Sequence, residues 1–307
     1  MICLKKVIVT GANGFVGSAL IRELIIHNIE VIALDLDGCN NNIPKNNLVS
    51  FLPASINNIK GIELADCAQN CDTFFHFAWA GSAGEARADY ELQLSNAKWT
   101  VDCLKTAYNI GCRKIVCAGS IMEQETIAAV FSSGNKPRMG YIYGSGKLVA
   151  HAMAASVAAQ LGIDFVWANI TNSYGPGEIS PRLVNTALRK IISGESPLFT
   201  SGTQNYDFVF ITDVAKAFYL LGECGHTHCT YVIGSGNARP LKEFLLEMKA
   251  SVALDLDFIF GDVPFTGIDI PIEKFDIKLI SEHTGFKPEI SFAEGTRKTM
   301  EWIKKQK

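Results

Sequence analysis

The sequence has no long apolar run and no block of basic residues. No segment approaches the roughly 18 consecutive apolar residues that span a bilayer. Residues 151–170 come closest, but His151, Gln160 and Asp164 interrupt them. Clustered Lys and Arg, typical of nucleic-acid binding, are also missing, and the net charge is only −3. The N-terminal residues indicate an early strand and no signal peptide. We therefore expect a cytoplasmic protein with neither a membrane nor a nucleic-acid partner.

The cysteines do not suggest disulfides or a metal site. Nine of them, an odd number, are scattered along the chain. Without a secretion signal, we expect them to be reduced and mostly buried. The segment "CGHTHC", residues 224–229, looks like a set of metal ligands. A structural zinc site, however, usually takes paired ligands from two separated segments. We favour a polar loop that leaves a helix, and we predict no metal.

Short apolar runs alternate with segments of helical periodicity through the first half of the chain. Strands are expected at 6–10, 30–35, 114–120 and 164–170, and helices at 18–28, 91–111 and 144–162. Strands without polar alternation are typical of a parallel sheet that is covered on both faces. From about Thr171 the chain becomes rich in Gly and Pro, which interrupt helices and strands. The sequence therefore predicts an α/β fold, a Rossmann-type doubly wound parallel sheet with a smaller interwoven C-terminal lobe.

Gly11, Gly14 and Gly17 lie between the first expected strand and the helix after it. Glycines here permit a tight turn, a close approach of the backbone to a pyrophosphate, and close packing of helix on strand. The N–H groups at the helix start can bind the anion. Asp35 ends the second strand, where a carboxylate accepts hydrogen bonds from the adenosine ribose and repels a 2′-phosphate. This pattern predicts a dinucleotide-binding site and favours NAD over NADP. It also favours a cofactor-binding role for Asp35 over that of an ordinary loop carboxylate.

Several further motifs follow in order along the chain. They are "FFHFAWAG" at 74–81, "VCAGS" at 116–120, "YGSGK" at 143–147, "NITNSYGPG" at 169–177, "YDFVFITDVAKAF" at 206–218, "YVIGSG" at 231–236 and "TGFKPEISFAEGTRKTMEWIK" at 284–304. Together with the glycine spacing, they make the chain resemble the extended short-chain dehydrogenase/reductase family over nearly its whole length. Most members of this branch act on nucleotide-activated sugars as epimerases, dehydratases or reductases. The resemblance implies an NAD-binding domain at 1–170 plus about 206–236, and a substrate lobe at about 171–205 plus 237–307.

The resemblance makes Ser120, Tyr143 and Lys147 the expected catalytic residues. Tyr143 and Lys147 are four residues apart, so a helix places them on one face. We expect the Lys147 charge to lower the pKa of Tyr143 from about 10 toward the working pH. Tyr143 would then exchange a proton with a sugar oxygen while a hydride moves to or from the nicotinamide. Ser120 would hydrogen-bond the same oxygen, and Tyr141 is expected to be structural.

The family pattern also implies residues that bind cofactor and substrate. The cofactor set is Gly11, Asn13, Gly14, Phe15, Val16, Gly17, Asp35, Ser55, Ala78 and Asn96, together with Tyr143 and Lys147. The substrate set is Trp79, Met122, Asn172, Tyr174, Arg182, Tyr206 and Arg239. His76 and Asp213 are expected to be structural.

Two departures from the family pattern concern the substrate. Dehydratases of the family carry Thr-Asp-Glu where this chain has "SIME", residues 120–123. Glu123 lies one residue after the position that the acid occupies in these dehydratases, which disfavours 4,6-dehydration. The arginine that usually binds the nucleotide diphosphate in this family is replaced by Tyr206. Arg182 or Arg239 would therefore have to bind the diphosphate.

The predicted activity is that of an NAD-dependent nucleotide-sugar oxidoreductase. A C4 epimerase and a 4-keto-6-deoxysugar reductase use the same three catalytic residues, and the sequence leaves both open. The alternatives are a nucleotide-sugar dehydratase and a non-catalytic dinucleotide sensor, because a fold alone does not fix a function. Homodimers are common in the family, and the Ala-rich helix after Lys147 is the expected interface.

Overall fold

The computed structural model describes residues 3–64 and 66–306, and its centre is one sheet of parallel strands. The strand order is β11-β6-β5-β4-β1-β2-β3. This order, with helical crossovers on both faces, is the doubly wound Rossmann arrangement, so the predicted fold is confirmed. The strands are β1 Lys6–Thr10, β2 Glu30–Asp35, β3 Val49–Pro53, β4 Thr73–His76, β5 Lys114–Ser120, β6 Asp164–Ile170 and β11 Cys229–Ile233.

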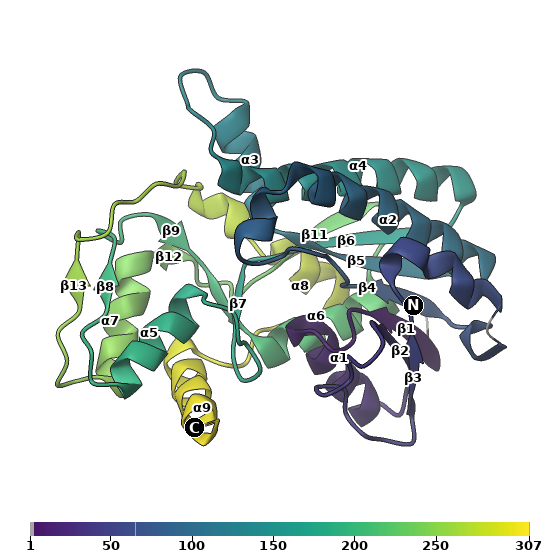
Figure 1. Cartoon of the computed structure of the whole chain (residues 1–307), viewed down its shortest axis with the longest axis horizontal. Coiled ribbons are helices and arrows are strands. Elements are labelled where there is room, and N and C mark those ends of the chain that lie inside the picture. Colours follow the sequence, from purple (N-terminus) through teal and green to yellow (C-terminus); the bar gives the residue numbers. More distant parts are fainter. Residues whose placement is uncertain (1–2, 65, 307) are drawn as a thin grey trace.

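Helices cover both faces of this sheet. In Figure 1, α2 and α4 lie along one face and α1 and α6 along the other. The strands between them are nearly all buried, which explains their continuous apolar sequences. The helices are α1 Phe15–Ile26, α2 Tyr90–Asn109, α3 Met122–Val130, α4 Ile142–Leu161, α5 Leu183–Ile192, α6 Ile211–Cys224, α7 Leu241–Val252, α8 Lys278–Thr284 and α9 Phe292–Lys305.

The smaller lobe combines α5, α7 and α9 with three two-stranded sheets (Figure 1). These sheets pair β10 with β7, β12 with β9 and β13 with β8. The strands are β7 Asn172–Tyr174, β8 Leu198–Phe199, β9 Asn205–Tyr206, β10 Phe208–Phe210, β12 Arg239–Pro240 and β13 Ile259–Phe260. Phe208, Phe244 and Phe292 pack together with ring centroids 5.0–5.1 Å apart.

One hydrophobic core runs from under the large sheet into this lobe. The cluster that holds Leu20 of α1 and Phe218 of α6 also holds Phe244 of α7 and Phe292 of α9. A second cluster fills the opposite face, between the sheet and α2 and α4. In addition, α8, which the sequence boundary places in the substrate lobe, packs against α6 and β11. The two lobes are therefore interwoven, as the change of character near Thr171 predicts.

No helix in the described ranges, 3–64 and 66–306, is long and apolar enough to cross a membrane. Within the same ranges, no group of three or more His, Cys, Asp or Glu side chains is arranged to hold a metal ion. In the segment 224–229, His226 instead stacks on His283, with ring centroids 3.9 Å apart.

Candidate active site

The glycine-rich turn between β1 and α1 needs glycine at two of its positions. Gly11 has φ +66°, and a Cβ there would lie 2.7 Å from the Ala78 nitrogen. A Cβ on Gly17 would lie 2.1 Å from the Gly11 carbonyl oxygen. Gly14 caps α1 with extended backbone and without a side-chain hydrogen bond. The first N–H groups of α1 therefore face a turn that only small residues can form, as anion binding requires.

Asp35 ends β2 directly beside this turn. Its Oδ2 accepts the Asn13 backbone N–H at 2.8 Å, and its Oδ1 accepts the Leu36 N–H at 2.8 Å. Asn13 is in turn joined to Asn42, because its Oδ1 accepts the Asn42 N–H at 2.7 Å. These bonds fix the Asp35 carboxylate at the mouth of the turn, where a ribose would lie.

A cavity of about 690 Å³ extends from this turn across the carboxyl ends of the strands. Its lining includes all but one of the residues predicted to bind the cofactor: Gly11, Asn13, Gly14, Phe15, Val16, Gly17, Asp35, Ser55, Ala78, Tyr143 and Lys147. Asn96 is different, because it is buried behind the cavity. Its side chain bonds both the N–H and the carbonyl of Ala80, at 2.9 and 2.8 Å, and so fixes a cavity wall.

Ser120 and Tyr143 lie at the far end of this cavity, at the end of β5 and the start of α4. The Ser120 Oγ accepts the Met122 backbone N–H at 3.2 Å. Its own hydrogen therefore stays free to bond the Tyr143 oxygen or a substrate oxygen. The predicted catalytic residues are thus brought together in one cavity.

Lys147 lies one turn further along α4 and is buried. Its ammonium donates to the Ala118 carbonyl at 2.8 Å and lies 3.6 Å from the centroid of the Trp79 ring. Burial lowers the pKa of Lys147 to about 7, although the charge of Glu123 acts in the opposite direction. Trp79, which the sequence predicts to bind substrate, lines the first cavity, packs on Lys147 and donates to Gln93 Oε1 at 2.7 Å.

The expectation that Lys147 lowers the pKa of Tyr143 is wrong for this arrangement. Burial raises the pKa of Tyr143 above its usual value, and the opposing influences come from Arg87, Arg182 and a hydrogen bond with Ser120. The physical reason is the position of Lys147, whose ammonium is held against Ala118 and Trp79. Arg87 is instead the cation that lowers the Tyr143 pKa most, and its Cζ lies 4.4 Å from the centroid of the Tyr143 ring.

A second cavity, of about 330 Å³, adjoins the first. Ser120, Tyr143 and Arg182 line both cavities, so two of the three predicted catalytic residues lie at their junction. Met122, Asn172, Tyr174 and Tyr206, all predicted to bind substrate, also line the second cavity. Tyr174 is almost fully buried, and its hydroxyl donates to the Phe292 carbonyl at 3.3 Å.

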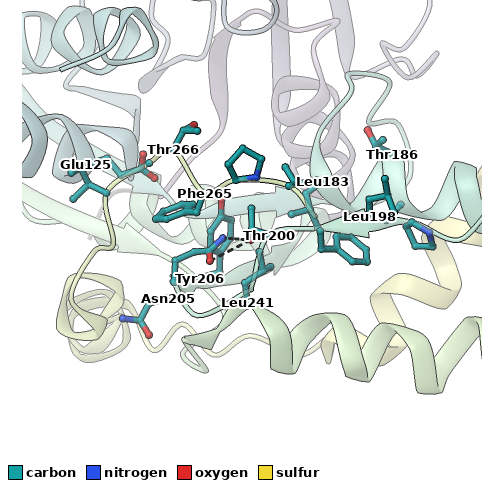
Figure 2. Close-up of a pocket in the computed structure, with 18 of the residues that line it drawn as sticks. Glu125, Leu183, Thr186, Leu198, Thr200, Asn205, Tyr206, Leu241, Phe265 and Thr266 are labelled. Atoms are coloured by element: carbon teal, nitrogen blue, oxygen red, sulfur yellow. Dashed lines mark hydrogen bonds between the residues drawn. The ribbon is translucent and has the colours of Figure 1, made fainter. Parts of the chain in front are cut away.

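A third cavity, of about 460 Å³, continues from the second into the smaller lobe. Tyr206 and Glu125 line both of them. Figure 2 shows Glu125 at one end of the third cavity and Leu198 at the other, with Tyr206 and Phe265 between them. Its walls are mostly apolar, and Lys190 is the cation among its lining residues in the described part of the chain.

Arg239 lies outside all three of these cavities within the described residues. Its guanidinium forms an ion pair with Glu247 and lies 4.1 Å from the centroid of the Phe244 ring. Arg182, the other candidate for the diphosphate, does line the second cavity, at the start of α5, where it pairs with Glu178 at 3.4 Å. The geometry therefore favours Arg182 of the two.

The structural roles expected for His76 and Asp213 are confirmed. His76 is buried between Thr10 Oγ1 at 2.9 Å and Thr100 Oγ1 at 3.1 Å, and burial lowers its pKa to about 3. Asp213 accepts the backbone N–H groups of Glu289 and Ile290.

Three charged residues of the second cavity, Arg87, Glu125 and Glu178, escaped the sequence prediction. Arg87 belongs to a short 3₁₀ helix, Glu85–Ala88, in a stretch without a periodic pattern. Glu125 follows Met122 by three residues on α3, so both face the cavity, whereas Glu123 points into the core. Burial raises the pKa of Glu125 to about 7. If the segment after Ser120 had been predicted as a helix, the three-residue spacing from Met122 would have placed Glu125 on the same face.

Comparison with known proteins identifies the family. Residues 7–234 match the NAD dependent epimerase/dehydratase family. The chain belongs to this family, whose members are NAD-dependent enzymes that modify nucleotide sugars.

Three similar proteins illustrate the range within this family. The chain is 25% identical to a dTDP-4-dehydro-6-deoxyglucose reductase from Escherichia coli, over 97% of each chain. It is 27% identical to a putative UDP-glucose 4-epimerase from Methanocaldococcus jannaschii, over 97% of this chain and 98% of that one. Its fold matches a UDP-N-acetylglucosamine 4-epimerase from Methanobrevibacter ruminantium, in complex with UDP-N-acetylmuramic acid, with a TM-score of 0.83 at 21% identity over 100% of both chains.

Proposed function

We propose that this protein binds NAD and acts on a hydroxyl or keto carbon of a nucleotide-diphosphate sugar, as a C4 epimerase or a 4-keto-6-deoxysugar reductase. The first cavity fits the cofactor: its glycine turn excludes a Cβ at Gly17, and Asp35 stands where the adenosine ribose would lie. When bound, NAD supplies a hydride acceptor or donor. Asp35 favours NAD over NADP, because a carboxylate repels a 2′-phosphate.

The observation that carries this proposal is the position of Ser120 and Tyr143. Both line the cofactor cavity and the adjoining cavity, so they lie where a hydride would pass from one bound molecule to the other. A non-catalytic sensor would not need a phenol and a hydroxyl at this junction and a buried lysine in the first cavity beside them.

The residues of this junction fit proton transfer to or from a sugar oxygen. In oxidation, the Tyr143 oxygen takes the proton of the sugar hydroxyl, and in reduction its O–H returns a proton to the carbonyl oxygen. Ser120 donates its free hydrogen to the same oxygen. Arg87 and Arg182 favour the phenolate, because their positive charges lower the Tyr143 pKa against the effect of burial.

The remaining cavities suit the rest of a nucleotide sugar. The sugar would occupy the second cavity, and Arg182 with the start of α5 would bind the diphosphate. The third cavity would hold the nucleoside against Tyr206 and Phe265 (Figure 2). Tyr206 replaces the usual family arginine, so the diphosphate has fewer cations here than the family pattern provides.

The first experiment identifies the nucleotide that the purified protein carries. The protein is purified without added cofactor and denatured, and the released nucleotide is quantified. Near-stoichiometric NAD⁺ supports an epimerase, which regenerates its cofactor in place. Little nucleotide, followed by NADH oxidation with 4-keto sugar nucleotides, supports a reductase. Bound NAD with no conversion of any nucleotide sugar would contradict the proposal and favour the sensor.

A second candidate, a nucleotide-sugar dehydratase, is favoured by Glu125. Glu123, whose position in the sequence disfavours dehydration, is buried away from the cavities. Glu125, in contrast, lines the sugar cavity, and its pKa is raised to about 7. A carboxyl group with that pKa can donate a proton to a departing hydroxyl near neutral pH. A product lighter than its substrate by one water, abolished in Glu125→Gln, would support this activity.

A further inference from the structure

Glu123 is a buried carboxylate that the proton transfer described above does not use. It is 1% exposed, and its Oε1 accepts the Ser120 backbone N–H at 3.1 Å and the Trp167 Nε1–H at 3.0 Å. Its Oε2 lies 3.3 Å from His151 Nδ1. A buried carboxylate is costly unless its charge is compensated. Its hydrogen bonds alone do not explain why the chain keeps an acid here.

One partner of Glu123, His151, lies on the face of α4 that also carries Tyr143 and Lys147. Tyr143, Lys147 and His151 are spaced at four-residue intervals, so they follow one another along the helix. His151 stacks on Trp167 with ring centroids 4.6 Å apart, and the Lys147 ammonium lies 6.0 Å from the same ring. Glu123 therefore contacts Ser120 through Oε1 and His151 through Oε2, and the Trp167 ring to which it is bonded also lies near the Lys147 ammonium.

We propose that Glu123 is a positioning residue for the catalytic centre: it fixes the Ser120 backbone, supplies the counter-charge of Lys147 and reaches solvent through His151. The proposal rests on the proposed roles of Ser120, Tyr143 and Lys147. His151 is partly exposed, and its Nε2 lies 3.1 Å from Thr230 Oγ1 at the surface. The chain Ser120–Glu123–His151–Thr230 thus links the active-site strand end to the outside.

The electrostatics around Lys147 agree with this geometry. The titratable groups that face it are Glu123 from α3, Cys117 from β5 and His76 from β4. Both Glu123 and Cys117 raise the pKa of Lys147, with Glu123 the larger influence. The Cys117 thiol and the His76 ring are fully buried, and burial favours their neutral forms. Glu123 is therefore the counter-charge among the described residues that face Lys147.

The test is an NMR titration of lysine side chains that needs no substrate. In protein with isotope-labelled lysine Cε, the wild type should show one resonance that titrates near pH 7, and Lys147→Met should remove it. Glu123→Gln keeps the acceptor oxygen for Ser120 and Trp167 but removes the charge. It should move this titration down by about one pH unit or more. Glu125→Gln, two residues further along α3, is the matched control and should leave it in place.

Variants of His151 keep the test decisive if Glu123→Gln does not fold. His151→Phe retains the stack on Trp167 but loses the contact with Glu123, and it should shift the titration in the same direction by a smaller amount. His151→Gln retains a hydrogen-bond donor to the carboxylate and should restore the wild-type curve. An unchanged Lys147 titration in Glu123→Gln, or an equal shift in Glu125→Gln, overturns the proposal.

Activity distinguishes this inference from the proposed function. With a nucleotide sugar that is turned over, Glu123→Gln should lower kcat about tenfold at neutral pH and leave KM nearly unchanged, since Glu123 lies outside the sugar cavity. A shifted Lys147 titration without any turnover by the wild type would support the role of Glu123 as counter-charge and contradict the proposed function. Turnover by the wild type together with an unchanged Lys147 titration in Glu123→Gln would support the proposed function and contradict the role of Glu123 as counter-charge.

Discussion

Tyr143 is the residue on which the proposed chemistry depends most directly. Its hydroxyl lies at the junction of the two cavities, where it would both give and accept a proton at the reacting oxygen. We expect Tyr143→Phe to lower kcat by about 10²- to 10⁴-fold, the usual contribution of a general acid or base. NAD binding, measured by calorimetry, should change little. As a control, Tyr108→Phe alters an exposed tyrosine at the end of α2 and should keep full activity. Wild-type turnover in Tyr143→Phe would exclude the assignment.

Lys147 should make the stability of the protein depend on pH. Its pKa falls from 10.5 to about 7 on folding, because burial disfavours the charged form. Between these two values the unfolded chain binds a proton that the folded chain does not, so stability should rise with pH through this window. Below about pH 7 both states hold the proton and the cost of burying the charge is present in full.

Lys147→Met checks this pH dependence by removing the titrating group. The free energy of unfolding of wild type and variant is measured in urea at several pH values. The difference should change by at least about 1 kcal/mol in favour of the wild type as pH rises from 7 toward 10.5. The slope is the readout, because the variant also leaves the Ala118 carbonyl without its partner at every pH. Parallel curves would mean that Lys147 is charged to the same extent in both states.

At the scale of the element, the conformation of the β1–α1 turn depends on its glycines. A Cβ at Gly17 would approach the Gly11 carbonyl oxygen to 2.1 Å, and neither backbone can move without separating α1 from β1. We expect Gly17→Ala to lower stability by about 1–3 kcal/mol and to abolish NAD binding. Gly61→Ala is the control, because a Cβ at Gly61 meets nothing within 4 Å. Thermal unfolding with and without NAD measures both effects. Equal behaviour of the two variants would show that the turn can adapt.

At the level of helices and strands, part of the candidate site could be predicted from the sequence and part could not. The turn around Gly14 and the pair Tyr143 and Lys147 are local patterns, so their elements and their common cavity followed from spacing. The positions of Glu123, which is buried, and Glu125, which lines the cavity, depend on where α3 begins, and no expected element covered that segment. Arg87 and Trp79 reach the site through an irregular connection. Their contacts depend on tertiary packing, which periodicity does not encode.

At the scale of the whole molecule, the three cavities follow one another through shared lining residues, from the glycine-rich turn, past Ser120 and Tyr143, into the smaller lobe. Because one hydrophobic core runs between the lobes, this order of cavities does not depend on a flexible linker. The three cavities together suit a long ligand pair better than a single small metabolite. This arrangement agrees with a dinucleotide and a nucleotide sugar that meet at Tyr143.

The adjacent helices α2 and α4 expose apolar side chains that indicate self-association. Tyr90 and Leu94 lie one turn apart on α2 and are 60% and 56% exposed, and Val149 and Met153 on α4 are 37% and 52% exposed. Contiguous apolar residues on a surface mark interfaces. We therefore predict a homodimer through these helices, with the Ala-rich helix α4 as part of the contact.

A double variant, Leu94→Glu with Met153→Glu, tests this dimer. Two like charges facing their symmetry mates would be buried unpaired, so dissociation should become at least about tenfold easier. Light scattering at micromolar concentration should then give the mass of a monomer for the variant and of a dimer for the wild type. Leu254→Glu, at a leucine that is 74% exposed after α7, should stay dimeric. A monomeric wild type would contradict the prediction. Because Tyr143 and Lys147 lie on α4, a monomeric variant with lower activity but unchanged NAD binding would show that dimer contacts hold this helix in place.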